Sequence, residues 1–138
     1  MQRALFDLFP GLAPRVPLAE LGVFPTPVEP LPAVEAEARV RLGSLYVKRD
    51  DLSSPFFGGN KVRTLESFFG RALREGATHV FSTGSFGSNH AVATVVHAPR
   101  VGLKSGALLY PQPPSREALE NVEAIVALAD RFVALPHW

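Results

Sequence analysis

The sequence predicts an α/β fold with a parallel sheet, and three observations support this prediction. Short apolar runs recur at 45–47, 78–83, 104–110 and 131–135. Segments with apolar residues at helical spacing separate these runs. The turns between them are rich in glycine, serine and proline. Strands that alternate with helices form parallel sheets, because each helix carries the chain back to the start of the next strand.

The residues before the first predicted strand form a proline-rich arm. Seven of the thirteen prolines lie between Pro10 and Pro32. Proline fixes φ and removes a hydrogen-bond donor, so we expect this segment to be extended and to lie against another part of the protein. The first predicted strand, 45–47, then leads into the turn-rich stretch DDLSSPFFGG.

Three helices are predicted after this stretch. The first begins near Asn60, an acceptable N-cap residue, and ends at Gly76. Its apolar residues at helical spacing are Val62, Leu65, Phe68, Phe69, Ala72 and Leu73. The second helix covers 90–98 and is closed by Pro99. The third has Ser115 as its N-cap, and its apolar stripe consists of Leu119, Val122, Ile125, Val126 and Ala129.

The last predicted strand, 131–135, is apolar, and no helix follows it in the sequence. Parallel sheets are covered by helices on both faces. We therefore expect residues 1–138 to form a single, incomplete α/β unit, with the arm and its lead-in over 1–44 and the lysine-bearing, small-domain portion over 45–138. Exposed apolar edges promote association, which predicts a homodimer.

Composition argues against several kinds of partner. The net charge is +1 and no basic cluster is present, which argues against nucleic acid or an acidic membrane. The absence of cysteine excludes disulfides and thiolate metal sites and fits a reducing compartment. No apolar run is long enough to span a membrane, and the first residues lack the features of a secretory signal. We therefore expect a cytoplasmic protein.

Lys61 lies in the first turn of the first predicted helix, four residues before Leu65, so it borders the apolar stripe. A lysine in a helix is normally a solvated charge. The positive end of the helix dipole disfavours a cation at this place and favours the neutral amine. Gly58 and Gly59 leave room for a ligand or a backbone to approach closely. An amine in this setting is suited to Schiff-base chemistry with a flat cofactor.

The second candidate segment is the loop STGSFGSNHA, 82–91, between a predicted strand and a predicted helix. Such a loop exposes backbone N–H groups at a helix N-terminus, where a carboxylate or a phosphate can bind. A plain tight turn capped by Ser88 or Asn89 explains the same residues. The glycine spacing matches neither a P-loop nor a dinucleotide-binding fingerprint. Thr83 stands where a nucleophile elbow needs glycine, so Ser85 is a weak candidate for a hydrolase nucleophile.

The two loops are expected to lie at the same edge of the sheet. Lys61 and Asn89 are 28 residues apart, about one α/β unit. Turns that follow parallel strands gather at the carboxyl edge of the sheet, where ligands bind. Lys61 together with Ser88 would also suit a Ser–Lys hydrolase, but no residue supplies the oxyanion partner that such an enzyme needs.

Other polar residues have simpler interpretations. The four histidines do not show a metal-ligand spacing, so we expect structural or surface roles for them and no metal site. Asp50 and Asp51 have the pattern of paired carboxylates. The adjacent Lys48 and Arg49 favour a salt-bridged strand end instead.

Four stretches, FPTPVEPLP, LYVKRDDL, GGNKVRTLE and GSFGSNHA, resemble fold-type II pyridoxal-phosphate enzymes in content and in order. The resemblance is closest to the D-cysteine desulfhydrase and 1-aminocyclopropane-1-carboxylate deaminase group, and it runs from about Val23 to about Leu108. It implies a three-layer parallel α/β fold of the tryptophan synthase beta-like class, with pyridoxal 5'-phosphate as cofactor. It also implies lyase or deaminase activity on a small amino acid, with release of ammonia and a keto acid.

The same resemblance implies roles for individual residues. Lys61 would form the Schiff base with pyridoxal phosphate and shuttle the α-proton of the substrate. Asn60 would support the turn that leads into Lys61, residues 58–61, which we call the lysine turn. Asn89 would hydrogen-bond the ring oxygen of the cofactor. Ser88 would assist proton transfer or bind the substrate carboxylate, together with the backbone amides up to His90.

One part of the family pattern is not matched. The glycine-rich loop that cradles the cofactor phosphate, and the residues that face the pyridine nitrogen, have no counterpart in residues 109–138. The resemblance therefore supplies only the lysine half of the site. The alternative is a truncated or non-catalytic chain that does not hold the cofactor.

Overall fold

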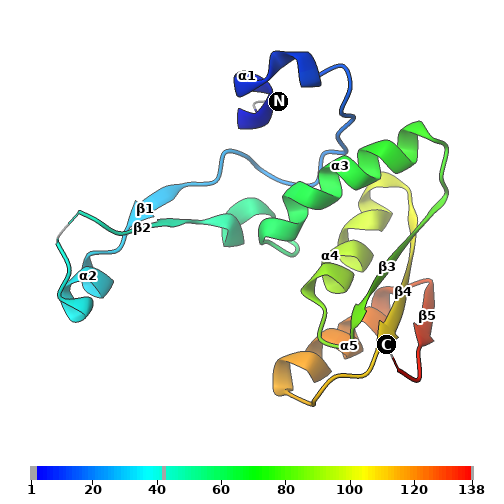
Figure 1. Cartoon of the computed structure of the whole chain (residues 1–138). Coiled ribbons are helices and arrows are strands. Elements are labelled where there is room, and N and C mark those ends of the chain that lie inside the picture. Colours follow the sequence, from blue (N-terminus) through cyan, green and yellow to red (C-terminus); the bar gives the residue numbers. More distant parts are fainter. Residues whose placement is uncertain (1–2, 42, 138) are drawn as a thin grey trace.

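The structure is a computed structural model that describes residues 3–41 and 43–137. Figure 1 shows a parallel sheet with its helices, and a thin ribbon made of β1 (Val28–Pro30) and β2 (Tyr46–Lys48) that extends away from them. The short helix α2 (Pro32–Ala38) lies at the far end of this ribbon. Helix α3 (Asn60–Arg74) begins where the ribbon meets the rest of the protein, so Lys61 lies at the junction.

The parallel sheet consists of β3 (His79–Ser85), β4 (Lys104–Tyr110) and β5 (Arg131–Ala134), in the order β3-β4-β5. The prediction of a parallel α/β sheet is confirmed for this part of the chain. Phe81 lies opposite Gly106, and a Cβ atom at Gly106 would come within 2.2 Å of the Phe81 ring. The ring of Phe81 therefore covers the space that the absent side chain leaves on β4.

The predicted strand at 45–47 does not join this sheet. It corresponds to β2, which pairs antiparallel with β1, and Val28 lies opposite Lys48. The Arg49 N–H also donates to the carbonyl oxygen of Pro27 across 2.9 Å, next to the ribbon. The proline-rich arm therefore supplies the partner strand, and placing 45–47 in the alternation of parallel strands was wrong. A strand of three residues carries too short an apolar pattern to specify its partner.

The three predicted helices correspond to α3, α4 (Asn89–His97) and α5 (Arg116–Leu128). Gly59 is the N-cap of α3, so Asn60 is the first helical residue and not the cap that was predicted. Gly76 follows the helix with φ of +73°, as expected for the residue that ends it. Ser115 caps α5 as predicted, because its side chain accepts a hydrogen bond from the Ala118 N–H across 3.1 Å.

The apolar stripes of the helices are narrower than predicted. The residues of the predicted α3 stripe that are buried are Val62, Leu65 and Phe69. Phe68 is 58% exposed and Leu73 is 42% exposed. On α5, Ile125 is buried, whereas Leu119 and Val126 are more than half exposed. Neighbouring positions on a helix differ by about 100°, so a residue one position away from the buried line points away from the core.

Two clusters of buried side chains form the core. The first joins the arm to α3 and α4 and consists of Ala19, Leu21, Val62, Leu65, Phe69, Ala93, Ala98 and Leu103. The second joins α4 to β4 and α5 and consists of Ala91, Val92, Val95, Ala107, Leu109 and Ile125. Phe57 packs against both clusters. Because Phe57 lies immediately before the GGNK stretch, the start of α3 is held where the two clusters meet.

The arm lies along α3, as predicted for an extended segment. Glu66, buried on α3, accepts two hydrogen bonds from the Arg3 guanidinium across 3.0 and 2.6 Å. The same carboxylate accepts the backbone N–H groups of Leu21 and Gly22, each across 3.2 Å. The Ala19 N–H donates to the Glu66 carbonyl oxygen across 2.8 Å. One buried carboxylate thus binds the arm at several points.

The arm and its lead-in also contain short helical segments that were not predicted: α1 (Ala4–Leu8), η1 (Pro10–Leu12) and α2. Glu35 of α2 is buried, and its carboxylate accepts the backbone N–H groups of Leu45, Gly43 and Ser44. These hydrogen bonds hold the pKa of Glu35 below its usual value, and the bond from Leu45 has the largest effect.

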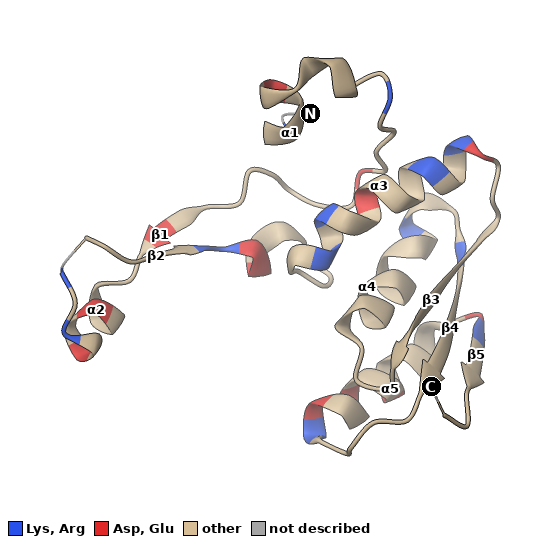
Figure 2. Ribbon diagram, in the orientation of Figure 1, with Lys and Arg blue, Asp and Glu red and all other residues tan. Residues whose placement is uncertain are grey.

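Charge is distributed unevenly over the elements near Lys61. Figure 2 shows Lys, Arg, Asp and Glu along β2, η2 (Asp50–Ser53) and both ends of α3, whereas α4 contains none of them. No helix within the described residues has the length and apolar character needed to cross a membrane.

Candidate functional site

The turn before Lys61 requires both of its glycines, for different reasons. A Cβ atom at Gly58 would lie 1.9 Å from the carbonyl oxygen of Asp51. Gly59 has φ of +125° and ψ of 174°, a conformation that is almost restricted to glycine. The first glycine therefore permits close backbone packing, and the second permits the sharp entry into α3.

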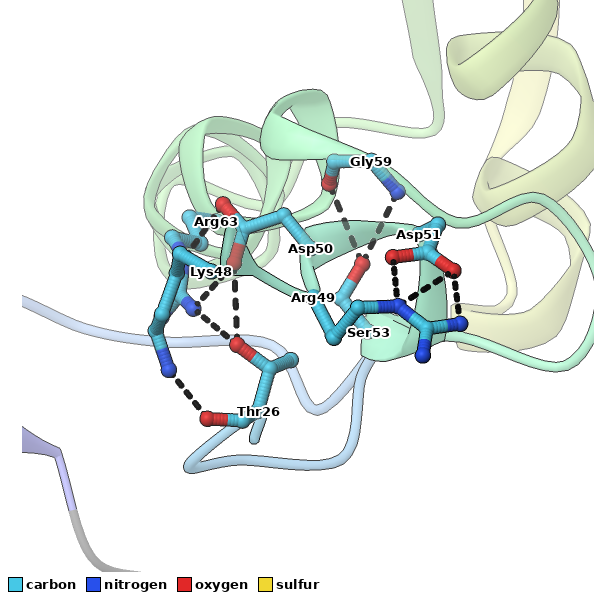
Figure 3. Close-up of polar contacts among 8 residues, drawn as sticks. All are labelled: Thr26, Lys48, Arg49, Asp50, Asp51, Ser53, Gly59 and Arg63. Atoms are coloured by element: carbon cyan, nitrogen blue, oxygen red, sulfur yellow. Dashed lines mark hydrogen bonds and ion pairs between the residues drawn. The ribbon is translucent and has the colours of Figure 1, made fainter. Parts of the chain in front are cut away.

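Hydrogen bonds from the preceding turn hold Gly59 in place (Figure 3). The Gly59 N–H lies 2.7 Å from the Asp50 carbonyl oxygen and 3.0 Å from Ser53 Oγ. The Ser53 hydroxyl donates to the carbonyl oxygen of Gly59 across 3.1 Å. Ser53 is fully buried, so these bonds are shielded from water. The stretch KRDDLSS therefore fixes the residue from which α3 starts.

A polar network joins the first turn of α3 to the arm (Figure 3). Arg63 pairs with Asp50 across 2.8 Å and also donates to the Thr26 hydroxyl across 3.1 Å. The Thr26 hydroxyl in turn donates to Asp50 across 2.9 Å, and Lys48 donates to the carbonyl oxygen of Thr26. The bond from Arg63 is the main reason why the pKa of Asp50 lies below its usual value.

Asp51 pairs with a different arginine. Arg49 contacts Asp51 across 2.7 Å and Glu29 of β1 across 2.7 Å. The predicted salt-bridged strand end is thus confirmed for Asp51, which pairs with the adjacent Arg49. For Asp50 the ion pair is formed with Arg63 of α3 and not with Lys48.

Lys61 is half-buried, and its side chain makes no hydrogen bond or ion pair within residues 3–41 and 43–137. Its neighbour in the sequence, Val62, is fully buried in the first core cluster. Burial lowers the pKa of His90, and the positive charge of Lys61 lowers it further. The lysine of the first loop therefore lies close enough to act electrostatically on the histidine that follows the second loop.

The glycine-rich loop ends in a helix cap. Ser88, one of the two cap residues that the tight-turn interpretation allows, is the N-cap of α4, and its Oγ accepts the Ala91 N–H across 3.2 Å. Within the part of the chain that the structure describes, the Ser88 hydroxyl donates to no other group, so its hydrogen is available to a ligand. A Cβ atom at Gly84 would come within 2.9 Å of Ser88 Oγ, so the loop folds tightly around this hydroxyl. Asn89 is exposed and His90 is half-buried on the first turn of α4.

Two contacts with α5 support this loop. Asn121 Nδ2 donates to the Gly87 carbonyl oxygen and to Asn89 Oδ1, both across 2.9 Å. A Cβ atom at Gly87 would lie 2.5 Å from Gln112 Nε2 and 3.1 Å from Ala118 Cβ. Sequence analysis missed Asn121, because nothing near it in the sequence connects it with a loop more than 30 residues earlier.

His97 joins the C-terminal end of α4 to the segment before the lysine turn. It is fully buried near the end of α4, and its Nε2 lies 3.0 Å from the carbonyl oxygen of Phe57. This contact confirms the structural role predicted for His97. His79 and His137 are exposed. Within the described ranges, no group of three or more His, Cys, Asp or Glu side chains is arranged to hold a metal ion.

The structure thus brings together some of the candidate residues. Ser88, Asn89 and His90 are consecutive at the start of α4, and Lys61 acts electrostatically on His90. Asn60 is exposed and makes no hydrogen bond with the described part of the chain, so the lysine turn depends on Asp50 and Ser53 instead. Among the described residues, the site offers an amine without an ion pair, a hydroxyl and an amide, at the starts of two helices that contact each other.

Comparison with known proteins gives a consistent result. Residues 19–135 match the family described as "Pyridoxal-phosphate dependent enzyme". A nocardicin C-9' epimerase from Nocardia uniformis subsp. tsuyamanensis is 40% identical over 91% of this chain and 36% of its own length. A putative 1-aminocyclopropane-1-carboxylate deaminase from Pyrococcus abyssi is 42% identical over 72% of this chain and 28% of its own. A D-cysteine desulfhydrase from Salmonella paratyphi C is 44% identical over 69% of this chain and 28% of its own length.

A solved structure is similar over the whole chain. The structure described as an ACC deaminase homologue superposes with a TM-score of 0.79 and 32% sequence identity, covering 100% of this chain and 39% of that one. The chain therefore spans about a third of the length of the relatives that it matches.

Proposed function

Because this chain belongs to the pyridoxal-phosphate dependent enzyme family, we propose that it carries the lysine half of a pyridoxal-phosphate site. The proposed activity of the protein is that of a lyase or deaminase acting on a small amino acid, of the D-cysteine desulfhydrase or 1-aminocyclopropane-1-carboxylate deaminase type, with release of ammonia and a keto acid.

The observation that carries this proposal is the setting of Lys61. A half-buried ammonium is normally paired with a carboxylate, because burial removes part of its hydration. Lys61 has no such partner among the described residues, whereas Arg49 and Arg63 nearby are both paired. The uncharged helix α4 faces this region. An amine without a counter-ion, held on a rigid turn, is suited to attack the carbonyl carbon of a pyridoxal ring.

The other candidate residues take complementary roles in this proposal. The Asn89 amide donates to the ring oxygen of the cofactor. Ser88, whose hydroxyl donates no hydrogen bond among the described residues, and the backbone N–H groups of Asn89 and His90 bind the substrate carboxylate at the N-terminus of α4. The N–H of Ser88 already donates to the carbonyl oxygen of Ser85 across 3.0 Å. Asn60 borders the cofactor beside Lys61. When bound, the cofactor supplies an electron-withdrawing ring that makes the substrate α-proton acidic, and Lys61 is the base that moves this proton.

A covalent labelling experiment tests the proposal. The purified chain is incubated with pyridoxal phosphate, reduced with borohydride and analysed by mass spectrometry after digestion. The label is expected on Lys61 and is expected to be absent from Lys61→Ala. The chain has two other lysines, Lys48 and Lys104, and Lys104→Ala, which changes an exposed lysine, serves as the matched control. No label, or a label spread equally over the three lysines, would contradict the proposal and favour the non-catalytic alternative.

A second candidate function is epimerisation. It is favoured by one observation: the relative named as an epimerase is similar over 91% of this chain, more than the deaminase and the desulfhydrase described above. An epimerase returns the proton to the same carbon, whereas a deaminase expels a group and releases ammonia. Candidate small amino acids in deuterated water, with pyridoxal phosphate present, distinguish the two. Deuterium uptake with inversion and without ammonia favours epimerisation, and ammonia release favours the lyase.

A further inference from the structure

The glycine-rich loop is supported by one amide side chain of α5 that binds it at two points. Asn121 is half-buried, and its Nδ2 lies 2.9 Å from the Gly87 carbonyl oxygen and 2.9 Å from Asn89 Oδ1. Gly87 itself packs closely against Gln112 and Ala118, since a Cβ atom there would lie 2.5 Å from Gln112 Nε2 and 3.1 Å from Ala118 Cβ. The carbonyl oxygen of Gly87 is therefore held in place as the acceptor for the amide of Asn121.

This arrangement determines which way both amides point. A backbone carbonyl only accepts hydrogen bonds, so the atom of Asn121 that faces Gly87 must be its nitrogen. The same nitrogen faces Asn89, so the atom of Asn89 that it contacts must be an acceptor, Oδ1. The orientation of the exposed Asn89 amide thus follows from a chain of two hydrogen bonds that begins at a backbone carbonyl.

The amino group of Asn89 is left as a free donor. Its oxygen faces α5, so its nitrogen faces away from α5, on the first turn of α4 beside Ser88 and His90. Within residues 3–41 and 43–137, this amino group has no hydrogen-bond partner. An amide that rotated freely would present its oxygen to a ligand in part of the molecules, and that oxygen repels an acceptor.

We propose that Asn121 is a positioning residue, which holds the amide of Asn89 with its donor end toward the bound cofactor. This inference rests on the proposed function, in which Asn89 donates to the ring oxygen of pyridoxal phosphate. Asn121 acts through Asn89, by removing the alternative rotamer before the cofactor binds.

The orientation is tested first without cofactor, by NMR of the side-chain amide groups. In the wild-type chain, the Asn121 amide protons are expected to be protected from exchange with solvent, and the Asn89 amide protons are expected to exchange freely. In Asn121→Asp the new carboxylate accepts only, so Asn89 turns over and its amide protons become protected. Protected Asn89 protons in the wild-type chain, or unchanged Asn89 signals in the variant, would overturn the proposal.

The second test uses bound pyridoxal phosphate and follows the pH dependence of its visible absorbance. Asn89→Ala removes the amide donor, and Asn121→Asp turns the Asn89 amide so that its oxygen takes the place of the donor. Both variants are therefore expected to shift the midpoint of the absorbance change with pH in the same direction. The double variant should shift it no further than Asn89→Ala alone, because Asn121 acts through Asn89. We expect cofactor affinity to fall about threefold to tenfold in each single variant, the value of one hydrogen bond.

Controls separate positioning from folding. Glu123→Gln changes an exposed residue of α5 and is expected to leave the midpoint unchanged. Asn121→Leu removes both hydrogen bonds and permits either orientation of Asn89, so its shift should lie between wild type and Asn121→Asp. If Asn121→Asp binds cofactor with the wild-type midpoint, the positioning role is wrong. If the wild-type chain holds no cofactor on Lys61, the proposed function fails, and the NMR measurement still decides the orientation.

Discussion

His97 and Phe57 are joined by a hydrogen bond of 3.0 Å between the Nε2 of a fully buried imidazole and a backbone carbonyl oxygen. Because the carbonyl only accepts, Nε2 is the nitrogen that carries the hydrogen. The bond ties α4, which begins at the glycine-rich loop, to the segment that leads into the lysine turn. The two halves of the candidate site are therefore coupled through the core.

Replacing this histidine should loosen the lysine turn. His97→Leu fills a similar space but leaves the Phe57 carbonyl without its donor, which costs about 1–3 kcal/mol of unfolding free energy. Urea denaturation measures this loss, and hydrogen exchange of the backbone amides before α3 measures the loosening. The exposed His79→Leu is the control, expected to change stability by less than about 0.5 kcal/mol. Equal effects of the two variants would contradict the role of His97.

The two glycines before Asn60 should respond differently to substitution. Gly59→Ala forces a side chain into a conformation that is almost restricted to glycine, at a cost of about 1–3 kcal/mol. Gly58→Ala should cost more, because its Cβ would lie 1.9 Å from the Asp51 carbonyl oxygen and the backbone must move. Gly11→Ala is the control, because a Cβ there meets nothing within 4 Å. Chemical denaturation ranks the three variants, and a Gly58→Ala chain as stable as the control would refute the close packing.

The pKa of His90 is sensitive to the charge of Lys61. Burial, and then the charge of Lys61, hold this pKa below its usual value. Lys61→Met removes the charge, so the pKa of His90 should rise while the contribution of burial remains. NMR titration of the His90 ring measures the change, with Lys104→Met as the control that leaves it unaltered. A His90 pKa that does not respond to Lys61→Met would mean that the loops lie apart in solution.

Acid should destabilise the protein through the carboxylates that hold the arm and the lysine turn. The pKa of Asp50 is lowered mainly by Arg63, and that of Glu35 mainly by the N–H of Leu45. A carboxyl group with a lowered pKa in the folded state stabilises the protein above its unfolded pKa, and this contribution is lost as the pH falls. The free energy of unfolding should therefore decrease from about pH 5 toward about pH 3.

Asp50→Asn identifies the share of this effect that arises at the lysine turn. The variant should be less stable than wild type at neutral pH and should lose less stability on acidification. Urea denaturation at several pH values measures both quantities, and Asp7→Asn, at an exposed position of α1, is the matched control. If the free energy of unfolding of Asp50→Asn falls with pH as steeply as that of wild type, the ion pair between Arg63 and Asp50 contributes nothing to acid sensitivity.

Local patterns were sufficient to predict most of the elements near the site. The spacing of Val62, Leu65 and Phe69 predicted α3, and the segments that form β3, β4 and β5 were also predicted. Ser88, the observed cap of α4, is one of the two cap residues that the sequence allowed. These features depend on residues a few positions apart, whose preferences act within one turn or one strand. The exposed Phe68 and Leu119 were assigned to the core because an apolar residue at the edge of a stripe looks the same in sequence whether or not another segment covers it.

The sequence by itself determined the order of strands and helices along the chain from α3 to β5, the two glycines of the lysine turn and the place of Lys61 at the start of a helix. Only the tertiary structure decided that β2 pairs with the proline-rich arm, that Glu66 binds that arm and that Asn121 orients Asn89. The residues of the bonds from Asn121 to Asn89 and from His97 to Phe57 are 32 and 40 positions apart in the chain. Such contacts depend on how whole elements pack, because a side chain's partner across the core leaves no local pattern in the sequence.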